Sequence, residues 1–238
     1  MSAMTITEAT REAFVLLLSG NADLWQIIWV SLKTSLLGLA LATVPAVVAG
    51  YLIATSRFRG RRVLIWLAQA ALALPTVLIG LLLYLLLSRQ GVLGPLQWLF
   101  SQSGVIAGQA LIDIPVLIAF TLSSVQAADP RLAETAITLG ANRWQVMLTV
   151  LHEVRFGVMA ALIYGFGRVL SEVGCAMMVG GNIAGVTRTI TTAIALETSK
   201  GEFAQGIALG IVLITLALVL NAALMLLQGD AKPAGYHR

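Results

Sequence analysis

Charge is scarce in this chain, because only 11% of its 238 residues are Asp, Glu, Lys or Arg, against about 25% in soluble domains. Cysteine is scarcer still, and the single Cys175 excludes a disulfide framework. No Gly-x4-Gly-Lys-Ser/Thr phosphate loop occurs, so the chain lacks the usual cradle for ATP. These absences argue against an ordinary soluble domain and against a nucleotide hydrolase with that loop.

Apolar sequence takes the place of charge, since hydrophobic residues make up 58% of the chain. A helix crosses the roughly 30 Å of a bilayer's hydrocarbon with about 20 consecutive apolar residues. We expect five such spans, at Thr34–Ala54, Val63–Ser88, Gly104–Ala128, Phe156–Gly181 and Phe203–Gln228. The predicted fold class is an all-α polytopic membrane protein with one transmembrane domain, 24–228, and a tail, 229–238. The spans leave no stretch for a separate soluble catalytic domain.

Three prolines, Pro45, Pro75 and Pro115, fall within the predicted spans. Proline in a helix interior removes a backbone hydrogen bond and kinks the axis. A bend that helps the bundle pack and a splayed helix that lines a cavity are both open at this point.

Basic residues lie mostly on one side of the predicted membrane. Nine of the fifteen Lys and Arg residues fall in the connections 55–62 and 129–155 and in the tail. Because such an excess in short loops marks the cytoplasmic face, we expect the C-terminus inside and the N-terminus outside. The connections 89–103 and 182–202 are then external. The net charge of +4 reports topology and not a nucleic-acid partner.

The first 23 residues are expected to lie on the membrane rather than across it. The stretch Thr5–Ser19 opens with Thr5-Ile6-Thr7-Glu8, an arrangement typical of a helix cap, and its apolar run stops at Gly20. Since that run is too short for a span, we predict an interfacial helix on the outer leaflet, in contact with membrane lipid.

The connection 129–155 holds more polar, helix-forming sequence than a simple loop needs. Asp129 and Pro130 favour a helix start, because an Asp side chain accepts hydrogen bonds from free amides and proline suits the first turn. Gly140 can end that helix in a left-handed conformation, and Asn142 can start a second one. The first helix carries an apolar stripe of Leu132, Ala136 and Leu139. A solvated connection and a docking surface for a soluble partner are the two interpretations.

The pattern Glu134-x-Ala136-x3-Gly140, followed by Val150, resembles the EAA loop of bacterial ABC-importer permeases. The resemblance implies a type I importer permease fold in the bacterial plasma (inner) membrane. It also implies that the short helix is a coupling helix, which inserts into a cytoplasmic ATPase dimer that binds Mg-ATP, while this chain binds no cofactor. The coupling residues that it suggests are Arg131, Leu132, Glu134, Ala136, Leu139 and Gly140.

Two positions depart from the family's pattern. Thr135 replaces the second residue of Glu-Ala-Ala, and His152-Glu153 stands where Leu-Pro usually closes the loop. Without that proline, the return helix could run continuously into the fourth span.

Two later runs, Gly167–Gly174 and Gly181–Thr189, are similar to the molybdate, sulfate and tungstate branch of these permeases. The segments Val179–Asn182 and Leu196–Phe203 look most like tungstate permeases. The resemblance implies ATP-driven import of an oxyanion, with tungstate as the first expectation and molybdate or sulfate as alternatives. An external binding protein would deliver the ion, and two copies of the chain would form a homodimer around the path.

Charged residues within the spans are the candidates for that path. Arg168 and Glu172 are four residues apart, so we expect them to share a face of one helix, where each costs roughly 2.5–3.5 kcal/mol. They form either an ion pair that locks packing or an oxyanion path in which Glu172 orients Arg168. Asp113 is a possible second partner of Arg168. On the outside, Thr187, Arg188 and Thr189 are candidates for a gate or for a binding-protein contact, against a plain solvated loop.

Two other classes of membrane protein compete with this interpretation. A self-sufficient secondary transporter or channel usually has more spans or internal repeats, and we find no convincing repeat. An intramembrane enzyme needs a nucleophile with its base, or a metal-ligand cluster, and only Asp113, Arg168 and Glu172 are charged within the spans. We therefore expect a transport subunit that is not itself an enzyme.

Overall fold

A computed structural model describes residues 10–11, 14–15 and 18–228 of the chain. The interfacial helix expected at Thr5–Ser19 and the tail 229–238 fall mostly or wholly outside the described residues. Within them every regular element is a helix and no strand forms, which confirms the all-α prediction. The α-helices are α2 (Ala22–Thr55), α3 (Arg61–Ala71), α4 (Thr76–Leu87), α5 (Gln102–Ala127), α6 (Arg131–Thr138), α7 (Arg143–Glu153), α8 (Arg155–Leu170), α9 (Gly174–Gly180), α10 (Ile190–Lys200) and α11 (Phe203–Gln228).

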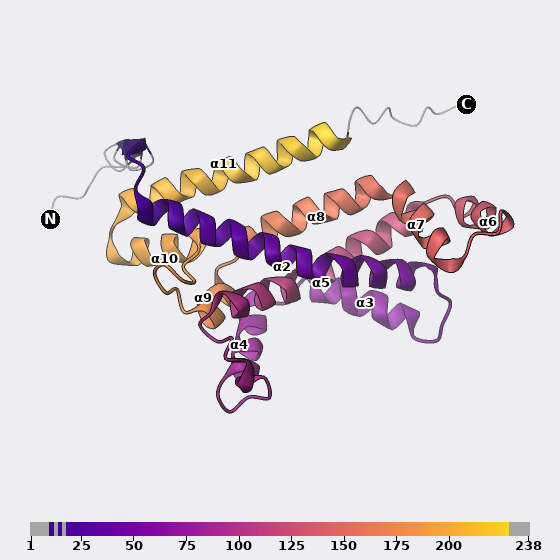
Figure 1. Cartoon of the computed structure of the whole chain (residues 1–238), viewed down its shortest axis with the longest axis horizontal. Helices are drawn as coiled ribbons and strands as arrows, with labels where there is room; N and C mark the ends of the chain where they lie inside the picture. Colours follow the sequence, from indigo (N-terminus) through magenta and orange to yellow (C-terminus); the bar gives the residue numbers. More distant parts are fainter. Residues whose placement is uncertain (1–9, 12–13, 16–17, 229–238) are drawn as a thin grey trace.

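Four helices, α2, α5, α8 and α11, run along the length of the molecule (Figure 1). Helices α6 and α7 lie at one end of it, α10 lies at the other, and α4 projects from the side. The first turns of α2 lie at the α10 end, whereas the last turns of α11 point toward the α6 end. The orientation of these ends relative to a membrane stays a prediction.

The first span is longer than expected. Helix α2 starts at Ala22, twelve residues before the predicted Thr34, because the Asn21 side chain accepts hydrogen bonds from the amides of Asp23 (3.0 Å) and Leu24 (3.3 Å). Its first turns are apolar and pack in a core with α10 and α11, which stabilises the extra length. By contrast, α5 and α11 match the predicted third and fifth spans closely.

Two of the five predicted spans are not continuous helices. The second is broken into α3 and α4, which meet at 101°, and Pro75 stands at the N-cap of α4, where no amide is available to continue a helix. The fourth, predicted at Phe156–Gly181, ends as a helix at Leu170 and continues as α9 from Gly174, and a 71° bend separates α8 from α7 just before it. Among the described residues, three helices are long and apolar enough to cross a membrane unbroken, and up to five spans result when each bent pair counts as one.

The connection 182–202, expected as an external loop, instead contains helix α10. Ile190 and Ala193 are fully buried in a core shared with α2 and α11, so this segment is part of the packed bundle. The helix starts at Thr189, whose side chain and that of Thr192 cap each other's backbone amides. Helix formation by Ile190–Lys200 thus depends on a cap and on distant apolar neighbours.

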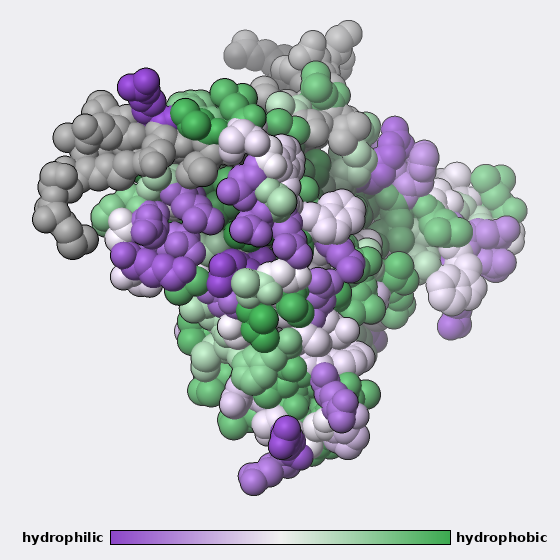
Figure 2. All heavy atoms as spheres, turned by 60° about the vertical axis from the view of Figure 1, so that its left-hand side comes forward, coloured by the Kyte–Doolittle hydropathy of each residue, from purple (hydrophilic) through white to green (hydrophobic). Residues whose placement is uncertain are grey.

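The lateral surface is strongly apolar. No residue of α3 (Arg61–Ala71) is buried, and most of α4 is exposed or half-buried although it is almost entirely hydrophobic. In Figure 2, polar side chains gather at the end of the molecule that faces the viewer, and the projection below it is mostly hydrophobic. An apolar surface of this kind must be covered by lipid or by another chain, which agrees with a multi-pass membrane protein.

Candidate functional site

Helix α6 is built by local capping, as predicted. The Asp129 carboxylate accepts a hydrogen bond from the amide of Arg131 (2.9 Å), and Pro130 precedes the first turn. At the other end, Gly140 has φ +84° and its amide donates to the carbonyl of Ile137 (3.0 Å). The amide of Ala141 donates to Ala136 (3.0 Å), which completes a Schellman motif. A Cβ at Gly140 would meet no atom, so the backbone angle alone requires glycine.

Helices α6 and α7 and the turn at Gly140 between them form an elbow (residues 131–153), and α7 anchors this elbow to the bundle. The side chain of Asn142 accepts from the amide of Gln145 (2.9 Å), and the Gln145 side chain accepts from the amide of Asn142 (2.8 Å). Three residues of α7, Val146, Met147 and Val150, are buried, and the last two form a core with Tyr51 of α2 and Val125 of α5. The loop is therefore packed, through α7, against the ends of α2 and α5.

The face of α6 itself stays uncovered. The helix has no buried residue between Arg131 and Thr138, and the side chains of Ile137 and Leu139 are 61% and 82% exposed. The predicted stripe, Leu132, Ala136 and Leu139, lines one groove of about 410 Å³ beside α7. Of the other coupling candidates, Arg131, Glu134 and Gly140 are also exposed.

The return helix does not run on into the fourth span, although no proline interrupts it. The backbone bends by 71° at Val154. The Arg155 guanidinium donates to the carbonyl of His152 (3.2 Å), contacts the His152 ring nitrogen (3.0 Å) and lies 4.8 Å from the centre of the Phe156 ring. These contacts give the carbonyl and the ring nitrogen of His152 a partner at the bend.

Arg168 and Glu172 do not share a helix face, so this expectation was wrong. Helix α8 ends at Leu170, where the hydroxyl of Ser171 donates to the carbonyls of Gly167 and Arg168 (both 2.9 Å) and competes with the helical amides. Glu172 Oε1 instead accepts from the amide of Cys175 (2.9 Å) in α9. In the described part of the chain the one ion pair joins Glu197 and Lys200, so Glu172 neither pairs with Arg168 nor orients it.

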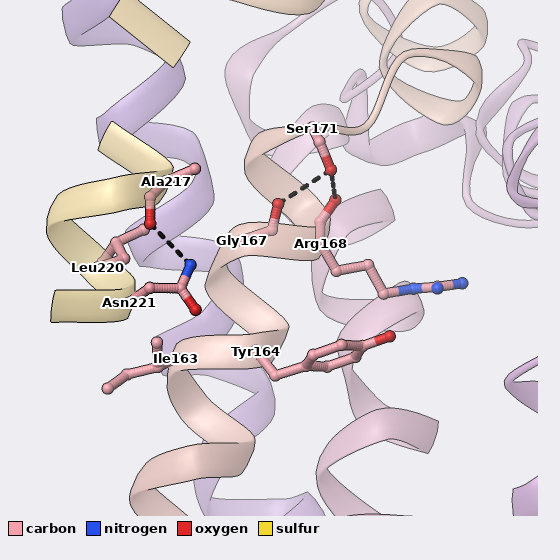
Figure 3. Close-up of a pocket in the computed structure, with 8 residues that line it drawn as sticks. All are labelled: Ile163, Tyr164, Gly167, Arg168, Ser171, Ala217, Leu220 and Asn221. Carbon is pink, nitrogen blue, oxygen red and sulfur yellow. Dashed lines mark hydrogen bonds between the residues drawn. The ribbon is translucent and has the colours of Figure 1, made fainter. Parts of the chain in front are cut away.

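Arg168 lines a pocket of about 420 Å³ between α8 and α11 (Figure 3). Its side chain extends away from α8 beside the ring of Tyr164, and the side chain of Asn221 lies on the α11 side. The side-chain amide of Asn221 donates to the backbone carbonyl of Ala217 (2.8 Å). The pocket thus brings together four polar side chains in otherwise apolar surroundings: those of Tyr164, Arg168, Ser171 and Asn221. Sequence reasoning missed Tyr164 and Asn221, although Asn221 is a polar side chain within the last predicted span.

Asp113 lies near the middle of α5 and is fully buried (0% exposed). Neither carboxyl oxygen has a hydrogen-bond partner within residues 18–228. The carboxyl group packs against α8 at Gly165, and no ion pair within 4.0 Å joins it to Arg168 in that range. Asp113 is therefore a neighbour of Arg168 but not its contact partner.

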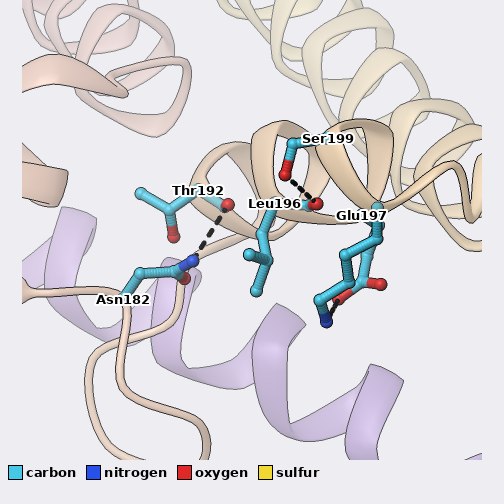
Figure 4. A network of polar contacts seen from close by, with 6 residues as sticks. Asn182, Thr192, Leu196, Glu197 and Ser199 are labelled. Carbon is cyan, nitrogen blue, oxygen red and sulfur yellow. Dashed lines mark hydrogen bonds and ion pairs between the residues drawn. The ribbon is translucent and has the colours of Figure 1, made fainter.

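The outer candidates Thr187 and Thr189 have structural contacts. The buried Thr187 hydroxyl donates to the carbonyl of Gly180 (2.6 Å) and accepts from the amide of Ile183 (3.0 Å), while Thr189 caps α10. Only Arg188 keeps a partly exposed side chain. Figure 4 shows how Asn182 reaches α10, where its side-chain amide donates to the carbonyl of Thr192 (3.3 Å).

A second outer contact was missed from the sequence. The ammonium group of Lys33 on α2 donates to the side chain of Gln102 (2.9 Å), which in turn donates to the carbonyl of Val186 (2.9 Å). The loop around Arg188 is thereby tied to α2 and α5. Across the described residues, no three His, Cys, Asp or Glu side chains are grouped so that they could hold a metal ion.

Comparison with known sequences gives related permeases. A tungstate uptake system permease protein, TupB, of Peptoclostridium acidaminophilum is 34% identical over 94% of this chain and 99% of its own length. The TupB protein of Campylobacter jejuni is 35% identical over 91% of this chain and 90% of its own. A molybdenum transport system permease protein, ModB, of Escherichia coli is 29% identical over 75% of this chain and 82% of its own.

Among solved structures, a bacterial alginate ABC transporter, in complex with its pentasaccharide-bound periplasmic protein, has a chain of similar fold. The TM-score is 0.72 at 19% identity, over 89% of this chain and 80% of that one. Residues 46–230 also match the profile of the binding-protein-dependent transport system inner membrane component. The chain therefore belongs to the family of inner membrane components of binding-protein-dependent transport systems.

Proposed function

We propose that this chain is the membrane-spanning permease subunit of an ATP-driven tungstate importer. The similarity to tungstate permeases extends over nearly the whole chain and is closer than that to the molybdenum permease. Molybdate and sulfate are the alternatives, because all three ions are tetrahedral dianions. An external binding protein, such as the one in the related alginate complex, would select the ion and deliver it to this chain.

One observation carries the coupling role: α6 presents exposed apolar side chains on a firmly capped elbow. Ile137 and Leu139 would bury apolar surface in a partner, at about 25 cal/mol per Å² removed from water. The sequence has no phosphate loop of its own, so ATP hydrolysis is assigned to a cytoplasmic ATPase dimer that receives α6. Arg131 and Glu134 flank the stripe as polar contacts, and Mg-ATP stays on the partner.

The path itself is assigned to two copies of the chain. The Arg168 pocket lies between only two helices, α8 and α11, and the apolar surfaces of α3 and α4 need a cover. A second copy that packs against these surfaces would enclose a passage lined by Arg168 from both chains. A guanidinium suits an oxyanion, because its planar donors match the spacing of the oxygens. Arg188 at the outer end is a contact for the binding protein.

The test is reconstitution in vesicles of this chain, its ATPase and its binding protein. We expect tungstate uptake that requires ATP, the ATPase and the binding protein together. Competition with molybdate and sulfate then ranks the substrates. Flux through the chain alone, without ATPase, would instead favour a secondary transporter or channel, and uptake that only sulfate inhibits would refute the tungstate assignment.

A further inference from the structure

The carboxyl group of Asp113 is the buried acidic side chain for which packing gives no explanation. It is completely removed from solvent in the interior of α5, and both oxygens lack a partner among the described residues. The other buried acidic groups, Glu172 and Glu197, each accept a hydrogen bond. An unpaired carboxyl within a span is costly and is retained mainly where it serves function.

Asp113 lies against the turn of α8 that carries Arg168. A Cβ placed on Gly165 would be 3.1 Å from Oδ1 of Asp113, a tight contact, so the missing side chain at Gly165 makes room for the carboxyl group beside α8. Gly165 precedes Arg168 by three residues, which is one helical turn. The Arg168 Nε atom is buried and also lacks a partner in the described part of the chain. Two groups of opposite charge therefore lie one turn of α8 apart, and screening of their attraction is weak because the Asp113 carboxyl group is fully buried.

We propose that Asp113 is the internal counter-charge of Arg168 and limits how tightly the path holds its oxyanion. The proposal rests on the proposed function and adds a positioning residue to the same path. A lone guanidinium in an apolar pocket would bind a dianion strongly and release it slowly. The carboxylate behind it offsets part of that attraction, which meets the need of a passage to bind an ion well enough for entry and weakly enough for exit.

The same face of α5 supplies a matched control. Gln109 and Thr121 lie four residues before and eight residues after Asp113, and each has a buried oxygen without a partner among the described residues. Both pack against α2, at Gly38 and Gly50, and carry no charge. Thr121→Val therefore removes an equally buried polar group while it leaves the charge near Arg168 unchanged.

The experiment measures equilibrium binding of radiolabelled tungstate to the purified complex of this chain with its ATPase, without binding protein. We expect Asp113→Asn to bind tungstate about tenfold more tightly, which corresponds to 1.4 kcal/mol. ATP-dependent uptake by the same variant should be slower, because release is delayed. Thr121→Val should match the wild type in both measurements. Asp113→Ser, a second neutral variant, serves if the Asn variant fails to assemble.

A double-substitution cycle with Arg168→Gln tests whether the effect of Asp113 on tungstate binding requires Arg168. We expect Asp113→Asn to change tungstate binding only while Arg168 is present. Unchanged binding in Asp113→Asn, or a tenfold change that persists beside Arg168→Gln, overturns the proposal. The cycle is repeated with molybdate and sulfate. If one of these anions, rather than tungstate, shows the Arg168-dependent change, the counter-charge is supported and the tungstate assignment falls.

Discussion

The loop 129–155, proposed above to dock on an ATPase, and the junction between α8 and α9 both contain helix ends, but different kinds of contact hold them. Around Gly140 and Asn142, every capping hydrogen bond joins residues at most five positions apart. At the α8–α9 junction, the Thr191 hydroxyl reaches back to the carbonyl of Glu172 (2.6 Å), nineteen residues earlier. The caps of the loop are all local, whereas the junction adds to its local bonds one that depends on the position of α10.

Under the proposed function, we expect this difference to give the two regions different parts in a transport cycle. A locally capped elbow can move as a unit and transmit force through the buried face of α7. A junction held by a distant helix changes when that helix shifts, and α10 lies at the end of the molecule opposite α6 (Figure 1). We therefore expect substitutions in the loop to uncouple transport without loss of stability, and substitutions at the junction to reduce stability first.

The largest effect is expected from Gly140→Pro. Proline fixes φ near −65° and has no amide, so it cannot adopt the observed +84° or donate to Ile137. ATP-dependent uptake should be abolished, while membrane insertion and the amount of folded chain stay normal. Gly60→Pro is the control, because Gly60 also has a positive φ and free space but lies before α3. Normal uptake in Gly140→Pro would contradict a role for the elbow in coupling.

The next effect concerns the exposed stripe. Leu139→Glu places a charge where burial in the partner is expected, and burying a leucine is worth about 1.5–3 kcal/mol. Affinity for the ATPase, measured by co-purification or titration, should fall at least tenfold. Thr138→Glu adds the same charge one residue away, at an exposed position outside the stripe. Equal losses in both variants would show that added charge, and not the lost leucine, weakens binding.

The two regions also differ in how far the sequence predicted them. Asp129, Gly140 and Asn142 act on amides of their own turns, so residue type and spacing were enough to predict the loop. The end of α8 depends on the hydroxyl of Ser171 and on a hydrogen bond from Thr191. The spacing of residues in the sequence does not predict that Thr191 lies beside Glu172. Continuous apolar sequence there predicted one long span, and the assumed face shared by Arg168 and Glu172 was wrong for that reason.

The pocket residues show the same limit. Arg168 could be chosen because charge is rare in a span, and Asp113 for the same reason. Tyr164 and Asn221 line the pocket with Arg168. Because a phenol or an amide is common in apolar sequence, residue type alone did not mark these two as pocket residues. Among the outer candidates, Thr187 and Thr189 are buried, which makes them structural residues. The sequence does not show this burial, because it depends on the fold.

A third prediction tests the junction. Glu172→Ala removes the acceptor for the buried amide of Cys175, and an unsatisfied buried donor costs about 1–3 kcal/mol. The melting temperature of the purified protein should fall, and hydrogen exchange should increase in α9 and in α10 together. Glu172→Gln keeps an acceptor oxygen and should retain most of the stability and of the uptake. If Gln abolishes uptake at normal stability, Glu172 acts through its charge.

The smallest effect is expected from Asn142→Ala, the matching change in the loop. Loss of an N-cap side chain costs about 0.5–2 kcal/mol, and the bonds with Gln145 are exposed and local. Hydrogen exchange should increase only in the first turn of α7, while the buried residues Val146 and Val150 keep their protection. Exchange that also rises in α2 or α5 would show that the elbow depends on the bundle as the α8–α9 junction depends on α10, and the contrast between the two regions would fail.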